Sequence, residues 1–153
     1  MKILIIQQKM IGDVLASSIL FEAIKHQYPD AELHYLINTH TFPVVDQNPY
    51  IDKVQFFTSE HEKSKLKLFK LAKQLRKENY DVIIDVYSKL SSNLITLLSK
   101  AKIKVSIDKG RNKLLYSNLY KHKAKADTNA GLAIENRLQL LQPLIIDTSK
   151  IVR

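Results

Sequence analysis

Short apolar runs alternate with longer amphipathic segments along the chain. The runs at 2–6, 33–37, 54–57, 80–86 and 102–107 have the length of β-strands, and the first and the fourth contain few polar residues. Apolar runs of this kind are typical of strands that are covered on both faces of a sheet. We therefore expect five buried strands in this order.

Helical periodicity fills the intervals between these runs. Apolar residues recur at helical spacing from Asp13 to about Gln27, in the basic segment 59–79, after the fourth run, and at about 130–142. Strands that alternate with helices favour parallel pairing through right-handed crossovers. The sequence thus predicts an α/β fold, a Rossmann-like doubly wound parallel sheet, and we expect the common strand order 3-2-1-4-5.

In this order the first and fourth strands are neighbours where the winding of the sheet reverses. Ligands of such sheets bind beyond the carboxyl ends of the strands at this switch point. The segments expected there are "QQKMIGDV" at 7–14 and "DVYSKLSSN" at 85–93. We therefore look for the chemistry of the protein in these two segments.

Composition narrows the class of protein. The 153 residues, 45% apolar and 25% charged, suit one globular domain, and no apolar stretch approaches the ~20 residues of a membrane-spanning helix. We expect a soluble cytoplasmic chain. The absence of cysteine excludes disulfides and thiolate metal sites. The net charge of +9 favours phosphate-bearing partners, but it fits nucleic acid, anionic lipid, a phosphorylated sugar or a merely soluble surface.

The glycine and histidine patterns exclude several kinds of site. Of the three glycines only Gly12 lies in the first loop, so the dinucleotide fingerprint is missing, and there is no Walker A motif. The five histidines share no metal-ligand spacing, and we expect no metal site. An ordinary Rossmann dehydrogenase or P-loop enzyme is therefore disfavoured.

Asp13 opens the first predicted helix and has two compatible interpretations. A carboxylate at a helix N-terminus is stabilised by the backbone amides and the helix dipole, by ~0.3–1 kcal/mol. At the mouth of the switch-point crevice it would also serve as a general base, with Lys9 and the helix amides favouring its charged form.

Three further features admit both a structural and a functional interpretation. Asp85 is expected to accept hydrogen bonds from loop amides, with a second catalytic carboxylate as the alternative. The hydroxyls of 88–92, with Lys89, fit either a polar or anionic ligand or simple helix capping. The lysine-rich tract 63–77 fits a helix packed on the sheet with a solvated outer face, or a surface for nucleic acid or membrane, although it lacks interleaved aromatic residues.

A series of landmarks resembles a known family. They are "KILII…IGDVL" at 2–15, "YPDAELHYLIN" at 28–38, "NPYIDKV" at 48–54, "YDVIID" at 80–85 and "ENRLQLLQPL" at 135–144. In this order and spacing the chain resembles the N-terminal half of the lipopolysaccharide heptosyltransferases, glycosyltransferase family 9.

The resemblance implies a GT-B fold, in which residues 1–153 form a Rossmann-like acceptor-binding domain and a C-terminal sugar-nucleotide domain is absent from this chain. It implies an inverting, metal-independent transfer of heptose from ADP-heptose to the Kdo-bearing core of lipid A. It also implies that Asp13 is the catalytic base. This domain alone is expected to be inactive, with no cofactor besides the nucleotide-sugar donor, which the missing domain mainly binds.

The same resemblance supplies further site residues. The acceptor-binding positions it implies are Lys9, Met10, Gly12, Ser88, Lys89 and Ser91, and the expected contacts to anionic lipid are Lys63, Lys65, Lys67 and Lys70. Lys9 and Met10 stand where the family often has serines, and Ser91 where it has a basic residue. A related sugar or another surface glycan therefore remains open as substrate.

The sequence therefore supports one leading hypothesis and two alternative classes of function. The leading hypothesis has a lipid-linked or phosphorylated glycan acceptor, a sugar nucleotide and peripheral contact with the inner membrane as partners, and no nucleic acid. The alternative is a non-catalytic basic module that binds nucleic acid or anionic membrane. A stand-alone nucleotide-binding domain is the third possibility, and the glycine-poor first loop argues against it.

Overall fold

The computed structural model describes residues 1–108, 122–125 and 137–144 of the chain. In chain order the elements are β1 (Lys2–Ile6), α1 (Ile11–Ser17), α2 (Ile19–Gln27), β2 (Glu32–Asn38), the 3-10 helix η1 (Thr39–Val44), β3 (Lys53–Phe57), α3 (Ser59–Lys63), α4 (Lys65–Arg76), β4 (Val82–Asp85), α5 (Leu90–Leu98), β5 (Ile103–Asp108), β6 (His122–Lys125) and the 3-10 helix η2 (Gln139–Leu144).

The strands form one parallel sheet in the order β3-β2-β1-β4-β5-β6. The predicted order of the first five strands is confirmed, as is the Rossmann-like α/β class. The sixth strand was not predicted, because "HKAK" has no apolar run. It pairs in parallel with β5, at the end of this strand order.

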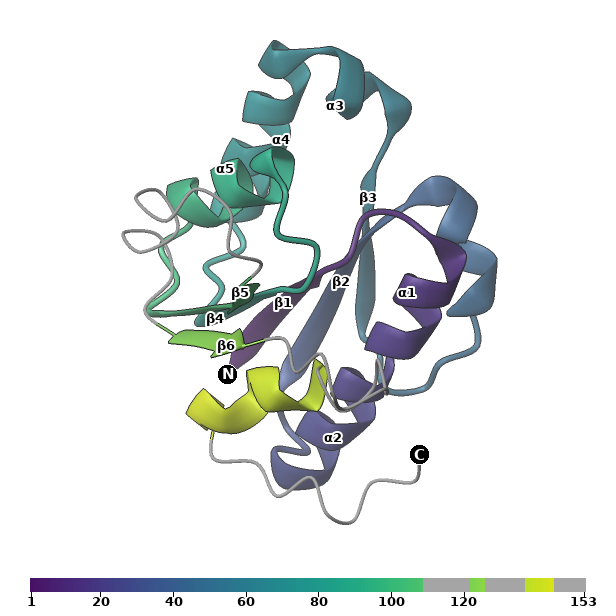
Figure 1. Ribbon diagram of the computed structural model, residues 1–153, viewed down its shortest axis with the longest axis vertical. Coiled ribbons are helices and arrows are strands. Elements are labelled where there is room, and N and C mark those ends of the chain that lie inside the picture. The colour runs from purple at the N-terminus through teal and green to yellow at the C-terminus, as the bar shows by residue number, and fades with distance from the viewer. Residues whose placement is uncertain (109–121, 126–136, 145–153) are drawn as a thin grey trace.

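Both faces of the sheet are covered, which explains the continuous apolar runs. Side chains of β1 alternate between two clusters, with Ile3 and Ile5 in one and Leu4 and Ile6 in the other. The first cluster includes residues of α2 and η2, and the second includes residues of α4 and α5. Figure 1 shows α1, α2 and η2 on one side of the sheet and α4 and α5 on the other.

Two of the expected helices are divided. The helix predicted from Asp13 to about Gln27 is split at Ser18, whose hydroxyl donates to the Leu15 carbonyl at 2.6 Å. The helix predicted over 59–79 is split at Ser64, whose extended backbone (φ −120°, ψ 115°) starts α4 and whose Oγ accepts from the Lys67 amide at 3.3 Å. Serine hydroxyls compete with the helical backbone for hydrogen bonds, so single continuous helices are wrong at both places.

The helix expected at 130–142 lies mostly outside the described residues. Within the described part, Leu138 and Leu141 are buried in the same cluster as β1 and α2, and η2 contains Pro143. The end of the described chain thus packs beneath the first helices. No helix among the described residues is long and apolar enough to span a bilayer.

Candidate functional site

The switch point lies between β1 and β4, which pair directly with Ile6 opposite Asp85. The backbone amides of Val86 and Tyr87 both donate to the Ile6 carbonyl, at 3.0 and 3.1 Å. The two loops predicted to carry the chemistry therefore leave the sheet side by side, as doubly wound sheets require.

The first loop turns sharply at Met10, which has φ 68° and ψ 116° and precedes α1. A non-glycine residue with positive φ is uncommon and strained. The Met10 carbonyl accepts the Val14 amide at 3.0 Å, and the side chain is 67% exposed. A Cβ at Gly12 would meet nothing within 4 Å, so the backbone at this point is open to the surroundings. The loop thus places Met10 and Gly12 on the surface beside Asp13.

Asp13 lies in the first turn of α1 with its side chain 48% exposed. One of its oxygens, Oδ1, accepts a hydrogen bond of 2.9 Å from Nη2 of Arg137. The Nε atom of Arg137 donates to Ser17 Oγ at 2.7 Å. Asp13 is therefore both accessible and fixed by a cation from the far end of the chain.

Lys9 does not pair with Asp13, contrary to the expectation that it would support this carboxylate. Its ammonium donates instead to Glu62 of α3, and this hydrogen bond holds the pKa of Lys9 above its usual value. The cation that bonds to Asp13 is Arg137. The Lys9–Glu62 contact also brings the basic segment next to the loop that leads to Asp13.

Asp85 holds the second loop, as its structural interpretation predicted. Its side chain is fully buried, and Oδ1 accepts the Ser88 amide at 2.8 Å. Its carbonyl accepts the Ser106 hydroxyl from β5 at 2.8 Å. Ser88 has φ 49°, so the loop turns sharply where it leaves the buried carboxylate. Asp85 therefore stabilises the conformation of the loop that follows β4.

The second loop meets the first through Ser91, whose hydroxyl donates to Gln8 Oε1 at 2.8 Å. Lys89 is exposed at the start of α5, where its backbone amide donates to Ser92 Oγ at 3.0 Å. The structure thus brings Ser88, Lys89 and Ser91 beside the loop of Lys9 and Met10. Capping by Ser92 shows that part of the serine-rich pattern is structural.

Gln8 was missed by the sequence analysis. It is fully buried, and its Nε2 atom has no hydrogen-bond partner among the described residues. The sequence feature that could have indicated it is the pair of glutamines, Gln7 and Gln8, directly after the apolar run of β1. Arg137 was also missed, although it lies inside the landmark "ENRLQLLQPL".

The four lysines expected to meet anionic lipid are exposed on α3 and α4. Lys67 pairs with Glu60 at 3.3 Å, whereas Lys63, Lys65 and Lys70 have no ion pair with any described residue. Leu66 is 64% exposed and Phe69 42% exposed between them. The inner face packs on the sheet through Leu71, Ala72 and Leu75. The inner face of α4 therefore packs on the sheet, as the structural interpretation of the lysine-rich tract predicted. The outer face of α3 and α4 is basic and partly apolar.

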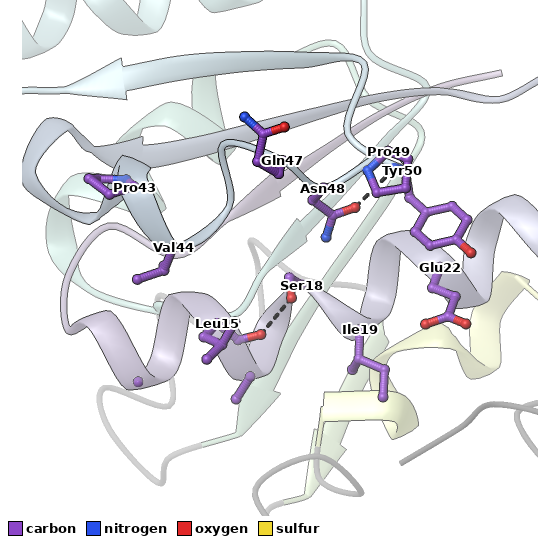
Figure 2. A pocket seen from close by; sticks show the side chains of 12 residues that line it. Leu15, Ser18, Ile19, Glu22, Pro43, Val44, Gln47, Asn48, Pro49 and Tyr50 are labelled. Atoms are coloured by element: carbon purple, nitrogen blue, oxygen red, sulfur yellow. Dashed lines mark hydrogen bonds between the residues drawn. The ribbon is translucent and has the colours of Figure 1, made fainter.

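A groove of about 590 Å³ lies on the other side of Gly12, between α1, α2 and the segment from η1 to β3. Figure 2 shows Leu15 of α1 on one side and Val44 and Pro43 on the other, with Glu22 and Tyr50 at one end. None of the predicted site residues except Gly12 lines it. The groove is thus adjacent to the switch point and separate from the residues that the sequence assigned.

The doubly wound sheet, with a carboxylate in the first turn of the helix after its first strand, defines a Rossmann-like α/β domain. The chain belongs to glycosyltransferase family 9 (heptosyltransferase), whose family model matches residues 68–151.

Curated relatives agree with this family. Over 141 residues the chain is 27% identical to lipopolysaccharide heptosyltransferase 3 of Escherichia coli, covering 90% of this chain and 41% of the relative. Over 136 residues it is 25% identical to lipopolysaccharide heptosyltransferase 1 of Campylobacter coli, covering 88% and 39%. The chain thus spans about two fifths of the length of these relatives.

Solved structures share the fold. A glycosyltransferase of family 9 from Veillonella parvula superposes with a TM-score of 0.82 at 17% identity, covering 96% of this chain and 42% of that one. An E. coli heptosyltransferase solved with ADP-2-deoxy-2-fluoro heptose gives a TM-score of 0.79 at 20% identity, covering 98% and 50%. These likenesses confirm the expected half of a GT-B architecture.

Proposed function

We propose that this chain is the acceptor-binding half of an inverting, metal-independent glycosyltransferase. The enzyme moves heptose, or a related sugar, from a nucleotide sugar to a lipopolysaccharide core or another surface glycan, and Asp13 is its general base. Family membership supports sugar transfer. The observation that carries the assignment of the base is the half-exposed Asp13 carboxylate at the switch point.

In this reaction Asp13 takes the proton of an acceptor hydroxyl as its oxygen attacks the anomeric carbon of the donor. The new bond forms on the face opposite the leaving group, the bond to the diphosphate breaks, and the configuration is inverted. One carboxylate suffices, unlike the pair that glycoside hydrolysis needs. The nucleotide sugar is bound mainly by a second domain, in keeping with the share of its relatives that the chain covers.

The acceptor occupies the edge where the two loops meet. Lys9, Met10 and Gly12 border it from the first loop, and Ser88, Lys89 and Ser91 from the second. The Ser91–Gln8 hydrogen bond supports this arrangement because it holds the loops together. Lys89, exposed at a helix start, fits an anionic group of the acceptor.

The basic outer face of α3 and α4 rests on the anionic headgroups of the inner membrane, which places the enzyme in the cytoplasm at that surface. Lys63, Lys65 and Lys70 are free of described ion pairs, and each lysine near an anionic bilayer adds about 1 kcal/mol of attraction. The contact between Lys9 and Glu62 supports this placement, because it joins the basic segment to the site loop.

Substitution of Asp13 tests this function in the full-length enzyme that the proposal implies. We expect Asp13→Asn to abolish transfer, while circular dichroism and urea unfolding still report a folded protein. Asp30→Asn is the matched control, since Asp30 lies in the exposed turn before β2, and it should transfer normally. Near-normal transfer by Asp13→Asn would remove Asp13 from the mechanism. Activity that disappears on chelation of divalent cations would contradict metal independence.

A further inference from the structure

Arg137 is a buried arginine, 8% exposed, that contacts α1 from a position 124 residues further along the chain than Asp13. A buried guanidinium is costly unless its donors are matched. Besides the buried Ser17 hydroxyl, Arg137 also bonds to the Asp13 carboxylate, which is half exposed at the switch point.

Two hydrogen bonds from Arg137 reach the same face of α1. Nε donates to Ser17 Oγ at 2.7 Å and Nη2 donates to Asp13 Oδ1 at 2.9 Å. Ser17 follows Asp13 by about one helical turn, so both side chains lie on one stripe of the helix. Nε and Nη2 belong to the same rigid edge of the guanidinium, which fixes its plane relative to the carboxylate.

The helix itself is held against the sheet beneath this contact. Tyr35 of β2 is fully buried, and its hydroxyl donates to the Val14 carbonyl at 2.8 Å. Burial raises the pKa of Tyr35 above its usual value, so the hydroxyl remains a donor at neutral pH. The backbone next to Asp13 is therefore anchored from β2, and its side chain is anchored from Arg137.

The two oxygens of Asp13 consequently differ. Oδ1 is bound by Arg137, whereas Oδ2 has no hydrogen bond to any described residue, on a side chain that is 48% exposed. A carboxylate that rotates freely presents its oxygens in many directions. Fixing one oxygen holds the two lone pairs of Oδ2 in defined directions, in which they can receive the proton of an acceptor hydroxyl.

We propose that Arg137 is a positioning residue for the reaction: it holds Asp13 through Oδ1, so that Oδ2 receives the acceptor proton in the transition state. This inference rests on the proposed function, because it assumes that Asp13 is the base. It adds a residue from the "ENRLQLLQPL" segment to a site whose other members lie before residue 92. Arg137 itself touches neither substrate in this proposal.

Steady-state kinetics of Arg137→Ala in the full-length enzyme test the proposal. Misplacement of a catalytic group by about 1 Å costs on the order of 10²-fold in rate, so we expect kcat to fall about 10- to 100-fold. KM for the nucleotide sugar should stay within about twofold, since that ligand binds mainly elsewhere. Ser17→Ala removes one anchor of the guanidinium and keeps its bond to Asp13, so kcat should fall by a smaller factor.

Rescue by added guanidinium distinguishes positioning from a merely structural role. Millimolar guanidinium should restore part of kcat to Arg137→Ala, while sodium chloride at equal ionic strength should not, and urea unfolding monitors the folded fraction throughout. If Arg137→Ala does not fold, the kinetics of Arg137→Lys are measured instead, because lysine keeps the positive charge but lacks the planar Nε–Nη2 edge of the guanidinium. It should fold with a lowered kcat and a similar KM.

The outcomes separate this inference from the proposed function. An inactive Asp13→Asn enzyme together with a normal kcat in Arg137→Ala, or in Arg137→Lys where Ala does not fold, would overturn the positioning role and leave the base in place. A normal kcat in Asp13→Asn would overturn both. Loss of kcat in the Arg137 variants that follows only the loss of folded protein would also overturn the positioning role.

Discussion

The hydroxyl of Ser91, in the first turn of α5, donates a 2.8 Å hydrogen bond to the side-chain oxygen of Gln8, just beyond β1. Gln8 is fully buried and Ser91 is partly buried, so this bond joins the two loops of the switch point below the surface of the site. The spacing between the loops, and with it the edge of the proposed acceptor site, depends on this contact.

Removal of the Ser91 hydroxyl should therefore be costly for so small a change. Ser91→Ala leaves Gln8 Oε1 buried without its donor, and an unsatisfied buried group costs about 1–3 kcal/mol. We expect the free energy of unfolding, measured by urea titration, to fall by about this amount. Ser59→Ala is the control, because Ser59 is exposed in α3. Equal stabilities of the two variants would show that the Ser91–Gln8 bond does not hold the loops.

The turn before α1 allows a second comparison between neighbours. Met10 has φ 68° and is 67% exposed, whereas Ile11 is 52% exposed and is the first residue of α1. Glycine removes strain at positive φ but costs about 0.5–1 kcal/mol inside a helix. Met10→Gly should thus lower the free energy of unfolding less than Ile11→Gly does. The reverse order in thermal or urea unfolding would refute strain at Met10.

The sheet could be predicted from sequence because its signal is local. Residues such as Ile3 to Ile6 are buried on alternating faces of the sheet. Because both faces are covered, most of the residues in such a strand are apolar, which produces a continuous apolar run in the sequence. The alternation of these runs with helices then restricts the topology to very few choices. β6 carries no such run, and it was missed for that reason.

The side-chain contacts of the site could not be predicted in the same way. The partner of Lys9 is 53 residues away and that of Asp13 is 124 residues away. From the sequence, Lys9 was expected to pair with Asp13 because it is the nearest cation along the chain. The packing of α3 instead brings Glu62 to Lys9, and the packing of the segment that contains Arg137 brings that arginine to Asp13. Asp85 was interpreted correctly because a carboxylate at the end of a buried strand has few acceptable partners except nearby amides.

Glu78 should contribute to stability against acid. Lys2 donates to its carboxylate at 2.6 Å and Lys53 at 3.3 Å, and chiefly the Lys2 hydrogen bond holds the pKa of Glu78 below its usual value of 4.5. A carboxyl group whose pKa is lowered by folding stabilises the protein above its unfolded pKa. This stabilisation is lost as the pH falls through the folded pKa.

Urea unfolding between pH 7 and pH 3 measures this contribution. The Glu78→Gln variant should lose stability at pH 7 and should show a shallower decline below about pH 4.5 than the unmodified protein. Glu60→Gln is the control, since Glu60 is 69% exposed and pairs with Lys67 at the surface. A decline below pH 4.5 that is equally steep in Glu78→Gln would show that the lysine pair does not act through this carboxylate.

The lysines of α3 and α4 make the proposed membrane contact testable with vesicles of phosphatidylglycerol and phosphatidylethanolamine. Replacing Lys63, Lys65, Lys67 and Lys70 together by glutamine removes about 1 kcal/mol each, so binding in a sedimentation assay should weaken about 10²- to 10³-fold. The contact is electrostatic, so binding of the unmodified protein should also weaken as salt increases. Lys100→Gln with Lys102→Gln is the control, because these exposed lysines lie in the loop between α5 and β5.

A parallel titration with DNA and RNA decides between this contact and the alternative of a basic nucleic-acid module. The exposed Leu66 and Phe69 among the lysines favour a lipid surface, since apolar side chains gain from burial at the headgroup boundary while phosphate backbones offer them little. Leu66→Ser should consequently weaken vesicle binding and leave residual binding to nucleic acid unchanged. Salt-sensitive binding to DNA or RNA in the absence of vesicle binding would instead assign this face to nucleic acid. The positive net charge of the chain would then serve nucleic-acid binding and not the proposed sugar transfer.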